Sequence, residues 1–443
     1  MNRPISGFSK KSKQEKIDWL AENYLQNNPA SVQILKKYWN EDAHLQQLHD
    51  DFIENTLSNY YLPFGIAPNF LINGKLFALP MVTEESSVVA AASNAAKFWL
   101  ERGGFNAEVI STEKNGQIHF NFEGSEKSNE AFFDAVKPKL LKSIQAIEKN
   151  MKARGGGMLE LSLMDKSHIL EGYYYIHATF ETLDAMGANF INSCLEQMAN
   201  TFEEEAKNFE TFQKDDTYPE VVMSILSNYV PECLVRAKVS CKVEELTTKH
   251  FDGKQFAEKF VRAIEIAKTE SRRAVTHNKG IMNGVDAVVL ATGNDFRAVE
   301  AGVHAYAARN SYYGSLTHAK IEDNIFTFWI ELPLAVGTVG GLTSLHPLTK
   351  LAFEILQKPN AKELMEIMAV AGLAQNFAAV RSLVTTGIQK GHMKMHLMNI
   401  LNQLHATKEE KEKAMEYFMT KPVSHSSAAD FFKTIEKLIR IEF

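Results

Sequence analysis

The order of hydrophobic patterns between residues 112 and 230 limits the fold of this chain more than any other feature. Apolar residues alternate with polar ones at Ile118, Phe120 and Phe122, as along a strand with one buried face. The next predicted elements are a helix over 126–154, strands over 158–163 and 169–180, a helix from Asp184 and a last strand. Strand, helix, strand, strand, helix, strand is the order of the ferredoxin-like split unit. We therefore expect a small ferredoxin-like domain over residues 112–230.

The rest of the chain is predicted to form a larger domain and a helical tail. Helices are expected in the first hundred residues, followed by a strand over 76–82 and an alanine-rich helix over 88–100. Residues 1–111 and 231–387 would form a large mixed α/β domain that carries the small domain as an insert, so the fold class is α+β. Residues 388–443 are charged and helical in pattern. Because glycines 387 and 391 bracket a short polar link, this tail is either a hinged flap or a packed terminal domain.

Composition excludes several classes of protein. The chain has 443 residues, 45% hydrophobic and 23% charged, which is ordinary for a soluble protein of two or more domains. A net charge of -6 without a basic block argues against nucleic-acid binding. The first 16 residues are polar, and we identify no apolar run near the ~20 residues that a membrane helix needs. We expect a cytoplasmic protein with no membrane or nucleic-acid partner.

Cysteine and histidine spacing does not indicate a metal site. Cys194, Cys233 and Cys241 form no Cys-x-x-Cys pair. His392 and His396 have the i, i+4 spacing of helical zinc ligands, but the glutamate of the zinc protease motif and a third ligand are missing. We therefore predict no metal.

Two short segments concentrate reactive side chains. Lys279 lies between glycine and asparagine residues in 276–284 (Thr-His-Asn-Lys-Gly-Ile-Met-Asn-Gly), and Asp295 ends 291–295 (Ala-Thr-Gly-Asn-Asp). The β-branched stretch between them, 285–290, predicts a buried strand, after which Asp295 would begin a helix and meet its positive dipole end. Lys279 could then stabilise a developing oxyanion and pair with Asp295. A purely structural ion pair fits the same residues equally well.

Phosphate binding has one candidate segment. The chain contains neither a Gly-x-Gly-x-x-Gly motif after a strand nor a Walker loop. Residues 184–189 (Asp-Ala-Met-Gly-Ala-Asn) are expected to open a helix, where free backbone amides can bind phosphate and Gly187 permits close approach. A plain helix cap at Asp184 is the simpler interpretation. A second glycine-rich turn at Gly337, Gly340 and Gly341 could admit a ligand or be a tight turn.

These motifs, in their order and spacing, resemble those of hydroxymethylglutaryl-CoA reductase, most closely its soluble bacterial class. The matching motifs are Glu85 before the alanine-rich helix, Asp184-Ala-Met-Gly-Ala-Asn, Thr276-His-Asn-Lys-Gly-Ile-Met-Asn-Gly, Ala291-Thr-Gly-Asn-Asp and Gly391-His-Met. The resemblance covers about residues 53 to 396. It implies the four-electron reduction of 3-hydroxy-3-methylglutaryl-CoA to mevalonate and CoA by NADH or NADPH, in a homodimer whose sites lie between subunits.

The resemblance also implies a role for particular residues. Lys279 would stabilise the oxyanion, Glu85 would give it a proton, and Asp295 would link the two. His392 would protonate the departing CoA thiolate from the C-terminal flap, and Arg273 would bind the free carboxylate of the substrate. The other implied positions are Ser87, Asn228, Asn283 and Gln375 for the substrate, and Asp184, Met186, Gly187, Asn189 and Glu148 for the dinucleotide.

Three positions depart from the family pattern. The Glu-Asn-x-x-Gly element ends here in Ser58, and the usual proline after Glu85 is Ser86. Met398, beside Asn399, replaces the typical arginine after His392. These changes affect the loop on the CoA side, the rigidity of the chain around Glu85 and a phosphate contact.

Cofactor preference and direction stay open at this stage. Glu148 would favour NADH by repelling a 2′-phosphate, whereas Lys149, Lys152 and Arg154 would favour NADPH. The same residues would serve the oxidative, mevalonate-degrading direction. A CoA-thioester-binding protein without turnover is the alternative from another class.

Overall fold

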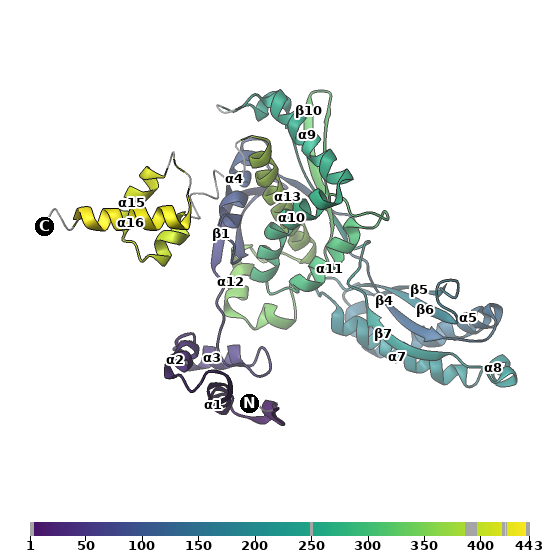
Figure 1. Ribbon diagram of the computed structural model, residues 1–443. Helices are drawn as coiled ribbons and strands as arrows, with labels where there is room; N and C mark the ends of the chain where they lie inside the picture. The colour runs from purple at the N-terminus through teal and green to yellow at the C-terminus, as the bar shows by residue number, and fades with distance from the viewer. Residues whose placement is uncertain (1–3, 249–250, 386–396, 419–420, 422, 440–443) are drawn as a thin grey trace. The chain divides into compact units, whose positions relative to one another are not determined.

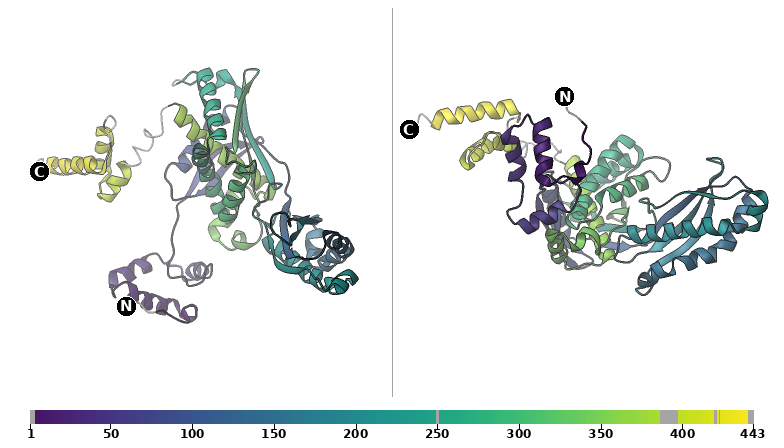
Figure 2. Two further views of the ribbon diagram at one scale, coloured as in Figure 1. Left: turned by 45° about the vertical axis from the view of Figure 1, so that its right-hand side comes forward. Right: turned by 90° about the horizontal axis from the view of Figure 1, so that it is seen from below.

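The computed structural model describes residues 4–248, 251–385, 397–418, 421 and 423–439 (Figures 1 and 2). Helices and antiparallel sheets both contribute to it, which confirms the predicted α+β class. Residues Met1–Pro63 form one compact unit and Phe64–Phe443 a second. The division into domains near residues 111, 230 and 387 stays a prediction.

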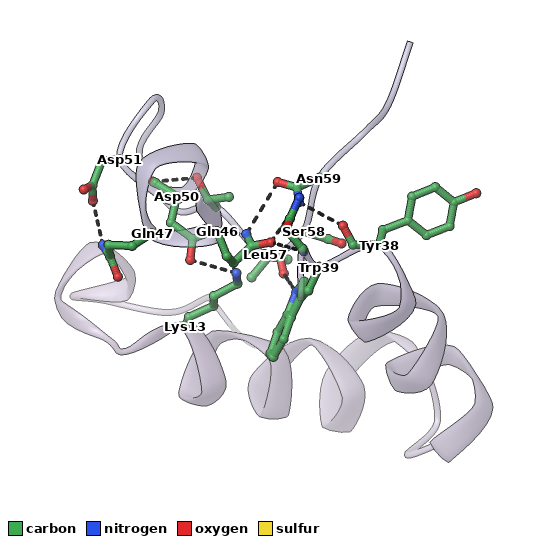
Figure 3. A network of polar contacts seen from close by, with 12 residues as sticks. Lys13, Tyr38, Trp39, Gln46, Gln47, Asp50, Asp51, Leu57, Ser58 and Asn59 are labelled. Atoms are coloured by element: carbon green, nitrogen blue, oxygen red, sulfur yellow. Dashed lines mark hydrogen bonds and ion pairs between the residues drawn. The ribbon is translucent and has the colours of Figure 1, made fainter. Parts of the chain in front are cut away.

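The N-terminal unit is a set of short helices joined by polar contacts (Figure 3). Its elements are η1 (Phe8–Lys10), α1 (Lys13–Tyr24), α2 (Pro29–Lys37) and α3 (Ala43–Asp50). Lys13 forms an ion pair of 2.7 Å with Asp50, and the Trp39 indole donates to the Leu57 carbonyl oxygen at 2.9 Å. Ser58, which replaces the family glycine, donates its hydroxyl to the Leu35 carbonyl oxygen at 2.6 Å. The hydroxyl thus ties this loop to α2.

The second unit opens with a hairpin of β1 (Phe64–Ile72) and β2 (Lys75–Val82). The sequence analysis predicted β2 but not β1. Asn73 and Gly74, both at positive φ, form the two-residue turn between the strands. The alanine-rich helix α4 (Val88–Leu100) has the predicted bounds and packs on β1.

A four-stranded antiparallel sheet and three long helices form the main core. The sheet order is β3 (Asn106–Val109), β8 (Leu234–Lys242), β10 (Ile325–Pro333) and β9 (Thr317–Glu322). The long helices are α9 (Gly253–Thr269), α10 (Ser271–Ala291) and α13 (Ala361–Val384), and shorter elements are η2 (Val243–Leu246), α11 (Phe296–Ala307), η3 (Gly341–Ser344) and α12 (Pro347–Ile355). Figure 1 shows α10 and α13 at the centre of this part.

Residues 285–290 are helical, so the predicted strand is wrong. They lie within α10, whose side chains Ile281, Val285, Val288 and Val289 are buried at helical spacing. Gly284 lies so close to α13 that a Cβ on it would be 2.5 Å from the Ala371 carbonyl oxygen. The glycines around Lys279 therefore do not make a loop, and at least Gly284 serves close packing between helices.

The inserted segment has the element order and pairing of a ferredoxin-like unit. Its elements are β4 (Lys114–Asn121), α5 (Glu126–Ser143), α6 (Gln145–Lys152), β5 (Gly157–Asp165), β6 (Tyr173–Glu181), α7 (Ala188–Ala206), α8 (Glu210–Asp215) and β7 (Glu220–Leu226). The antiparallel sheet order is β5-β6-β4-β7, and α5 and α7 pack together beside it (Figure 1). The long predicted helix is divided at Ile144, and the second helix begins at Ala188 rather than Asp184.

One described helix, α13, is long and apolar enough to cross a membrane, which the sequence analysis overlooked. However, 72% of its apolar window is buried inside the protein, as in a core helix.

The C-terminal part has α15 (Lys408–Tyr417), α16 (His425–Ile439) and a small apolar core of its own that includes Leu401, Ala414 and Phe418. The predicted hinge at residues 387–391 lies outside the described residues.

Candidate functional site

The candidate catalytic centre forms where the end of β2 meets the middle of α10. β2 ends at Val82, and the loop up to Ser87, which has φ of 79°, carries Glu85. Lys279 of α10 forms an ion pair with Glu85, with 2.7 Å between Nζ and Oε2. Asn283, one turn later, donates its amide to the same oxygen at 3.3 Å. An ammonium, a carboxyl and an amide thus converge on one point.

These three residues line a pocket of about 250 Å³, which we call the Lys279 pocket. Its other polar lining residues are Thr83, Glu84, Asp286 and Glu300. The Lys279 and Glu85 side chains are 59% and 40% exposed, so both can reach a molecule that enters from solvent. This arrangement can place a cation and a proton donor on one carbonyl oxygen.

The predicted substrate residues are divided among several places. Arg273 lies in the first turn of α10, where burial lowers the pKa of its guanidinium. Ser87 caps α4, two residues beyond Glu85. Gln375 of α13 is buried, its Oε1 atom has no hydrogen-bond partner among the described residues, and its Cβ lies against Gly284. Asn228 lines a small apolar pocket with Lys114 and Met186 instead.

Among the described residues, no contact of Asp295 with Lys279 or Glu85 is found. It caps α11 as predicted, accepting the backbone N–H groups of Arg297 and Ala298, and it forms an ion pair of 2.9 Å with the Arg297 guanidinium. Twelve residues separate Lys279 from the end of α10 at Ala291, which is about 18 Å at the rise of an α-helix. The predicted contact with Lys279 assumed a strand with a returning loop, whereas α10 is a helix, and the contacts found for Asp295 among the described residues are with α11.

Asp295 instead lines a second pocket, of about 380 Å³, which we call the Gly187 pocket. Met186, Gly187 and Asn189 line it from the start of α7, and Gly337, Gly340 and Gly341 line it from the turn after β10. Gly187 caps α7 at φ of 96° without a side-chain cap, so amide groups of the first helical turn are open to an anion. These features fit the phosphates of a dinucleotide.

Asp184 holds this segment in place rather than capping the helix. Its carboxylate accepts the backbone N–H of Ala361, and its carbonyl oxygen accepts that of Thr338, both at 2.8 Å. A Cβ on Gly337 would lie 2.5 Å from the Met186 nitrogen, so only glycine permits this approach. The glycine-rich turn therefore packs directly against the 184–189 segment, which the sequence analysis left open.

The sequence analysis did not identify Lys114 as a candidate site residue. It is buried at the start of β4, and its ammonium donates to the Thr182 hydroxyl at 2.5 Å and to the Ala185 carbonyl oxygen at 3.2 Å. Burial lowers the pKa of Lys114. One signal was available, since Lys114 has the same strand parity as the inward residues Ile118 and Phe120.

Glu148 is 1% exposed and already has partners. Its carboxylate accepts the Met158 backbone N–H at 2.6 Å and binds the Lys152 ammonium at 2.6 Å. The sequence analysis gave Lys152 and Glu148 opposite effects on cofactor preference. In the structure, Lys152 is the ion-pair partner of Glu148.

Two further expectations concern metals and the flap. Burial raises the pKa of the Cys233 thiol to about 11, so this side chain is a neutral core residue. Among the described ranges, no group of three potential metal ligands occurs. His392 and His396 lie outside those ranges, as does any flap hinge.

Acid should destabilise the helix that carries Lys279. Burial and the nearby Arg273 charge lower the pKa of His277 from 6.5 to about 3, and its Nε2 contacts the Thr317 hydroxyl at 2.6 Å. The unfolded chain gains a proton at this histidine below pH 6.5 and the native chain does not, so stability present above pH 6.5 is lost as pH falls toward 3. The loss is about 1 kcal/mol per pH unit. His277→Gln, which keeps a polar contact, should show a smaller fall in Tm between pH 7 and 5 than the wild type. Equal falls in the two proteins would contradict a role of His277 in the loss of stability.

Comparison with known proteins gives a consistent result. The family model of hydroxymethylglutaryl-coenzyme A reductase matches residues 12–397. The chain is 35% identical over 418 residues to the Archaeoglobus fulgidus 3-hydroxy-3-methylglutaryl-coenzyme A reductase, covering 94% of this chain and 91% of that one. It is 38% identical over 369 residues to a probable reductase of Borreliella burgdorferi, covering 82% and 81%.

Solved structures of reductases also match this chain. The reductase of Streptococcus pneumoniae superposes with a TM-score of 0.72 at 33% identity, covering 97% of this chain and 100% of that one. A class II structure from the same organism, bound to NADPH in open conformations, matches with a TM-score of 0.71 at 34% identity, covering 86% and 100%. The resemblance seen in the motifs is thus confirmed over nearly the whole length, and the chain belongs to the hydroxymethylglutaryl-CoA reductase family.

Proposed function

We propose that this chain reduces 3-hydroxy-3-methylglutaryl-CoA to mevalonate and free CoA, using two molecules of reduced nicotinamide dinucleotide and two protons. The observation that carries the proposal is the contact of Lys279 and Asn283 with Glu85 in the Lys279 pocket. Family membership over residues 12–397 gives the substrate.

The residues of the Lys279 pocket supply charge and protons. The ammonium of Lys279 donates to Glu85 at 2.7 Å and can turn to a substrate carbonyl oxygen as negative charge develops there. Glu85 then gives a proton to that oxygen, and Asn283 holds the carboxyl in position. Arg273, on the same helix, binds the free carboxylate of the substrate. His392 is proposed to protonate the leaving thiolate.

The Gly187 pocket is proposed to bind the dinucleotide, which when bound supplies the hydrides. The uncapped start of α7 and the close turn at Gly337 support this role. A relative in the family is bound to NADPH. Because the buried Glu148 carboxylate is paired with the more exposed Lys152 ammonium, it repels a 2′-phosphate less than a free carboxylate would, which supports use of NADPH. Loss of nicotinamide absorbance, measured in parallel with NADH and NADPH and checked for mevalonate, tests both points.

We propose further that two copies of the chain build each site. Within one chain, the Lys279 pocket and the Gly187 pocket are two pockets lined by different residues. A hydride donor and its acceptor must be in contact. A homodimer in which the Lys279 pocket of one protomer faces the Gly187 pocket of its partner meets this requirement.

Mixing two inactive variants tests this arrangement. Lys279→Ala and Asp295→Asn, co-expressed with different tags, should form hybrid dimers with one intact site. At random pairing, the mixture should regain about a quarter of wild-type activity. The control pairs Lys279→Ala with Glu85→Gln, whose lesions share one pocket and should not complement. Equal inactivity of both mixtures would exclude the shared site.

The reductive direction and a cytoplasmic location are part of the proposal. The burial of α13 inside the protein argues against this helix spanning a membrane. Mevalonate oxidation with CoA and oxidised cofactor would use the same residues, so comparing the two directions at matched concentrations identifies the preferred one. A thioester-binding protein without turnover would bind substrate and leave nicotinamide absorbance unchanged in both directions.

A further inference from the structure

Three carboxyl residues beyond Glu85 line the Lys279 pocket, and two of them, Asp286 and Glu300, lie on helices. Asp286 follows Lys279 on α10 by seven residues, or two turns, so both lie on one face of the helix. Glu300 reaches the pocket from α11, and a side-chain hydrogen bond joins it to Asp286. Two carboxyls in hydrogen-bond contact hold one proton between them, because like charges this close are not both ionised.

The proton of this pair belongs to Asp286 at neutral pH. Burial, with the bond to Glu300 and its charge, raises the pKa of Asp286 to about 9. The bond from His304 lowers the pKa of Glu300. The Asp286 Oδ1 atom is buried and has no hydrogen-bond partner among the described residues. Buried polar atoms seldom lack a partner, so this oxygen is available for a hydrogen bond to a molecule in the pocket.

A chain of contacts leads from this acid to the surface. Glu300 contacts His304 at 2.7 Å, and the other ring nitrogen of His304 contacts the Tyr313 hydroxyl at 2.7 Å. His304 is 35% exposed, which allows it to exchange protons with solvent. Every link can carry a proton, and histidine exchanges one readily near neutral pH.

The reaction creates a need for such a chain. Each turnover consumes two protons, of which one reaches the CoA thiolate and one stays on the alcohol oxygen of the product. The proton that Glu85 gives in the first hydride step returns to it when the thiohemiacetal loses its hydroxyl proton on release of CoA. Glu85 is therefore left as a carboxylate after the second hydride step. It must regain a proton before the next turnover. A neutral acid on the same pocket wall is a suitable source.

We propose that Asp286, Glu300 and His304 form a proton relay that reloads Glu85 after the second hydride step; this rests on the proposed roles of Glu85 and Lys279. The Asp286 O–H proton passes to the Glu85 carboxylate through a water molecule, for which a pocket of about 250 Å³ has room. Asp286, left as a carboxylate, takes the His304 proton through Glu300, and His304 takes one from solvent. Protons balance, and no bond between heavy atoms changes.

Asp286→Asn tests the relay, because asparagine keeps the shape and can still donate to Glu300 but has no proton to give. Affinity for the thioester and Tm should stay near those of the wild type, whereas kcat should fall about 10- to 100-fold. Imidazole buffer should restore part of kcat in the variant and leave the wild type unchanged.

The pH profile gives a third readout. The donor form of Asp286 is lost as pH rises through about 9, so the wild-type rate should fall there and the variant should lack this limb. The charged and titratable groups around Asp286 are Glu84, Glu85, Lys279, Glu300, His304 and Tyr313. None is changed in the variant.

Wild-type kcat in Asp286→Asn would overturn the relay, and so would a low kcat with an unchanged pH profile and no rescue. If Asp286→Asn fails to fold, Glu300→Gln interrupts the next link of the relay. Its kcat, its rescue by imidazole and its pH profile then test the proposal in the same way. If neither folds, the pair is structural and the relay is wrong. Failure of the proposed function looks different, since the wild type itself would then show no turnover.

Discussion

Replacing Lys279 by alanine should lower turnover by about 1,000-fold, the loss expected for removing a main donor to a developing oxyanion. Lys279 is the one cation in the described residues that contacts Glu85, with 2.7 Å between Nζ and Oε2. Its removal takes away both the charge on the substrate oxygen and the partner that orients the proton donor. Since both interactions strengthen in the transition state, kcat should fall far more than substrate affinity.

The fold should tolerate this change. The Lys279 side chain is 59% exposed and its ion pair lies at the edge of a pocket, where such pairs contribute little to stability. Circular dichroism and Tm of Lys279→Ala should match the wild type, and the thioester should still bind. Lys279→Arg is the matched control, because it keeps the charge but not the point-like geometry and should lose less. Turnover near the wild-type value in a folded Lys279→Ala would remove Lys279 from the mechanism.

Hydrophobic patterns in the sequence predicted some elements of this protein correctly and others wrongly. Alternation and helical spacing predicted α4 to the residue and the order of the ferredoxin-like segment. The segment 285–290 was misread because three valines favour a strand, although Ile281, Val285 and Val289 follow one another at a spacing of four, as on a helix face. Glycines at 280 and 284 reinforced the error, since glycine in a sequence suggests a loop more readily than close helix packing.

The sequence did not show which residues of the candidate site are in contact, because those contacts depend on the same helix. The resemblance named Glu85, Lys279 and Asp295 but could not say which of them touch in one chain. That depends on α10 being helical from Lys279 to its end at Ala291. Asp286 was hidden inside the apolar stretch that looked like a strand, and Glu300 carries no motif. Tertiary packing makes these two acids neighbours, and no spacing in the sequence records that.

Gly280 and Gly284 should respond in opposite ways to the same substitution, although both lie in α10 and only four residues apart. A Cβ on Gly284 would be 2.5 Å from the Ala371 carbonyl oxygen and 2.8 Å from the Gln375 Cβ, both on α13. Backbone cannot move aside as a flexible side chain does, so Gly284→Ala must push α10 away from α13. We expect a loss of about 3 kcal/mol in the free energy of unfolding.

Gly280 provides the control within the same helix. A Cβ there meets no heavy atom within 4 Å, and its φ is not in the left-handed region. Gly280→Ala should therefore gain about 0.5–1 kcal/mol, because alanine loses less backbone freedom on forming a helix. Urea unfolding of both variants beside the wild type measures the two shifts. If both substitutions destabilise equally, helix packing at Gly284 is not the cause; opposite signs would show that the glycine next to Lys279 is dispensable for folding while Gly284 sets the distance between the two central helices.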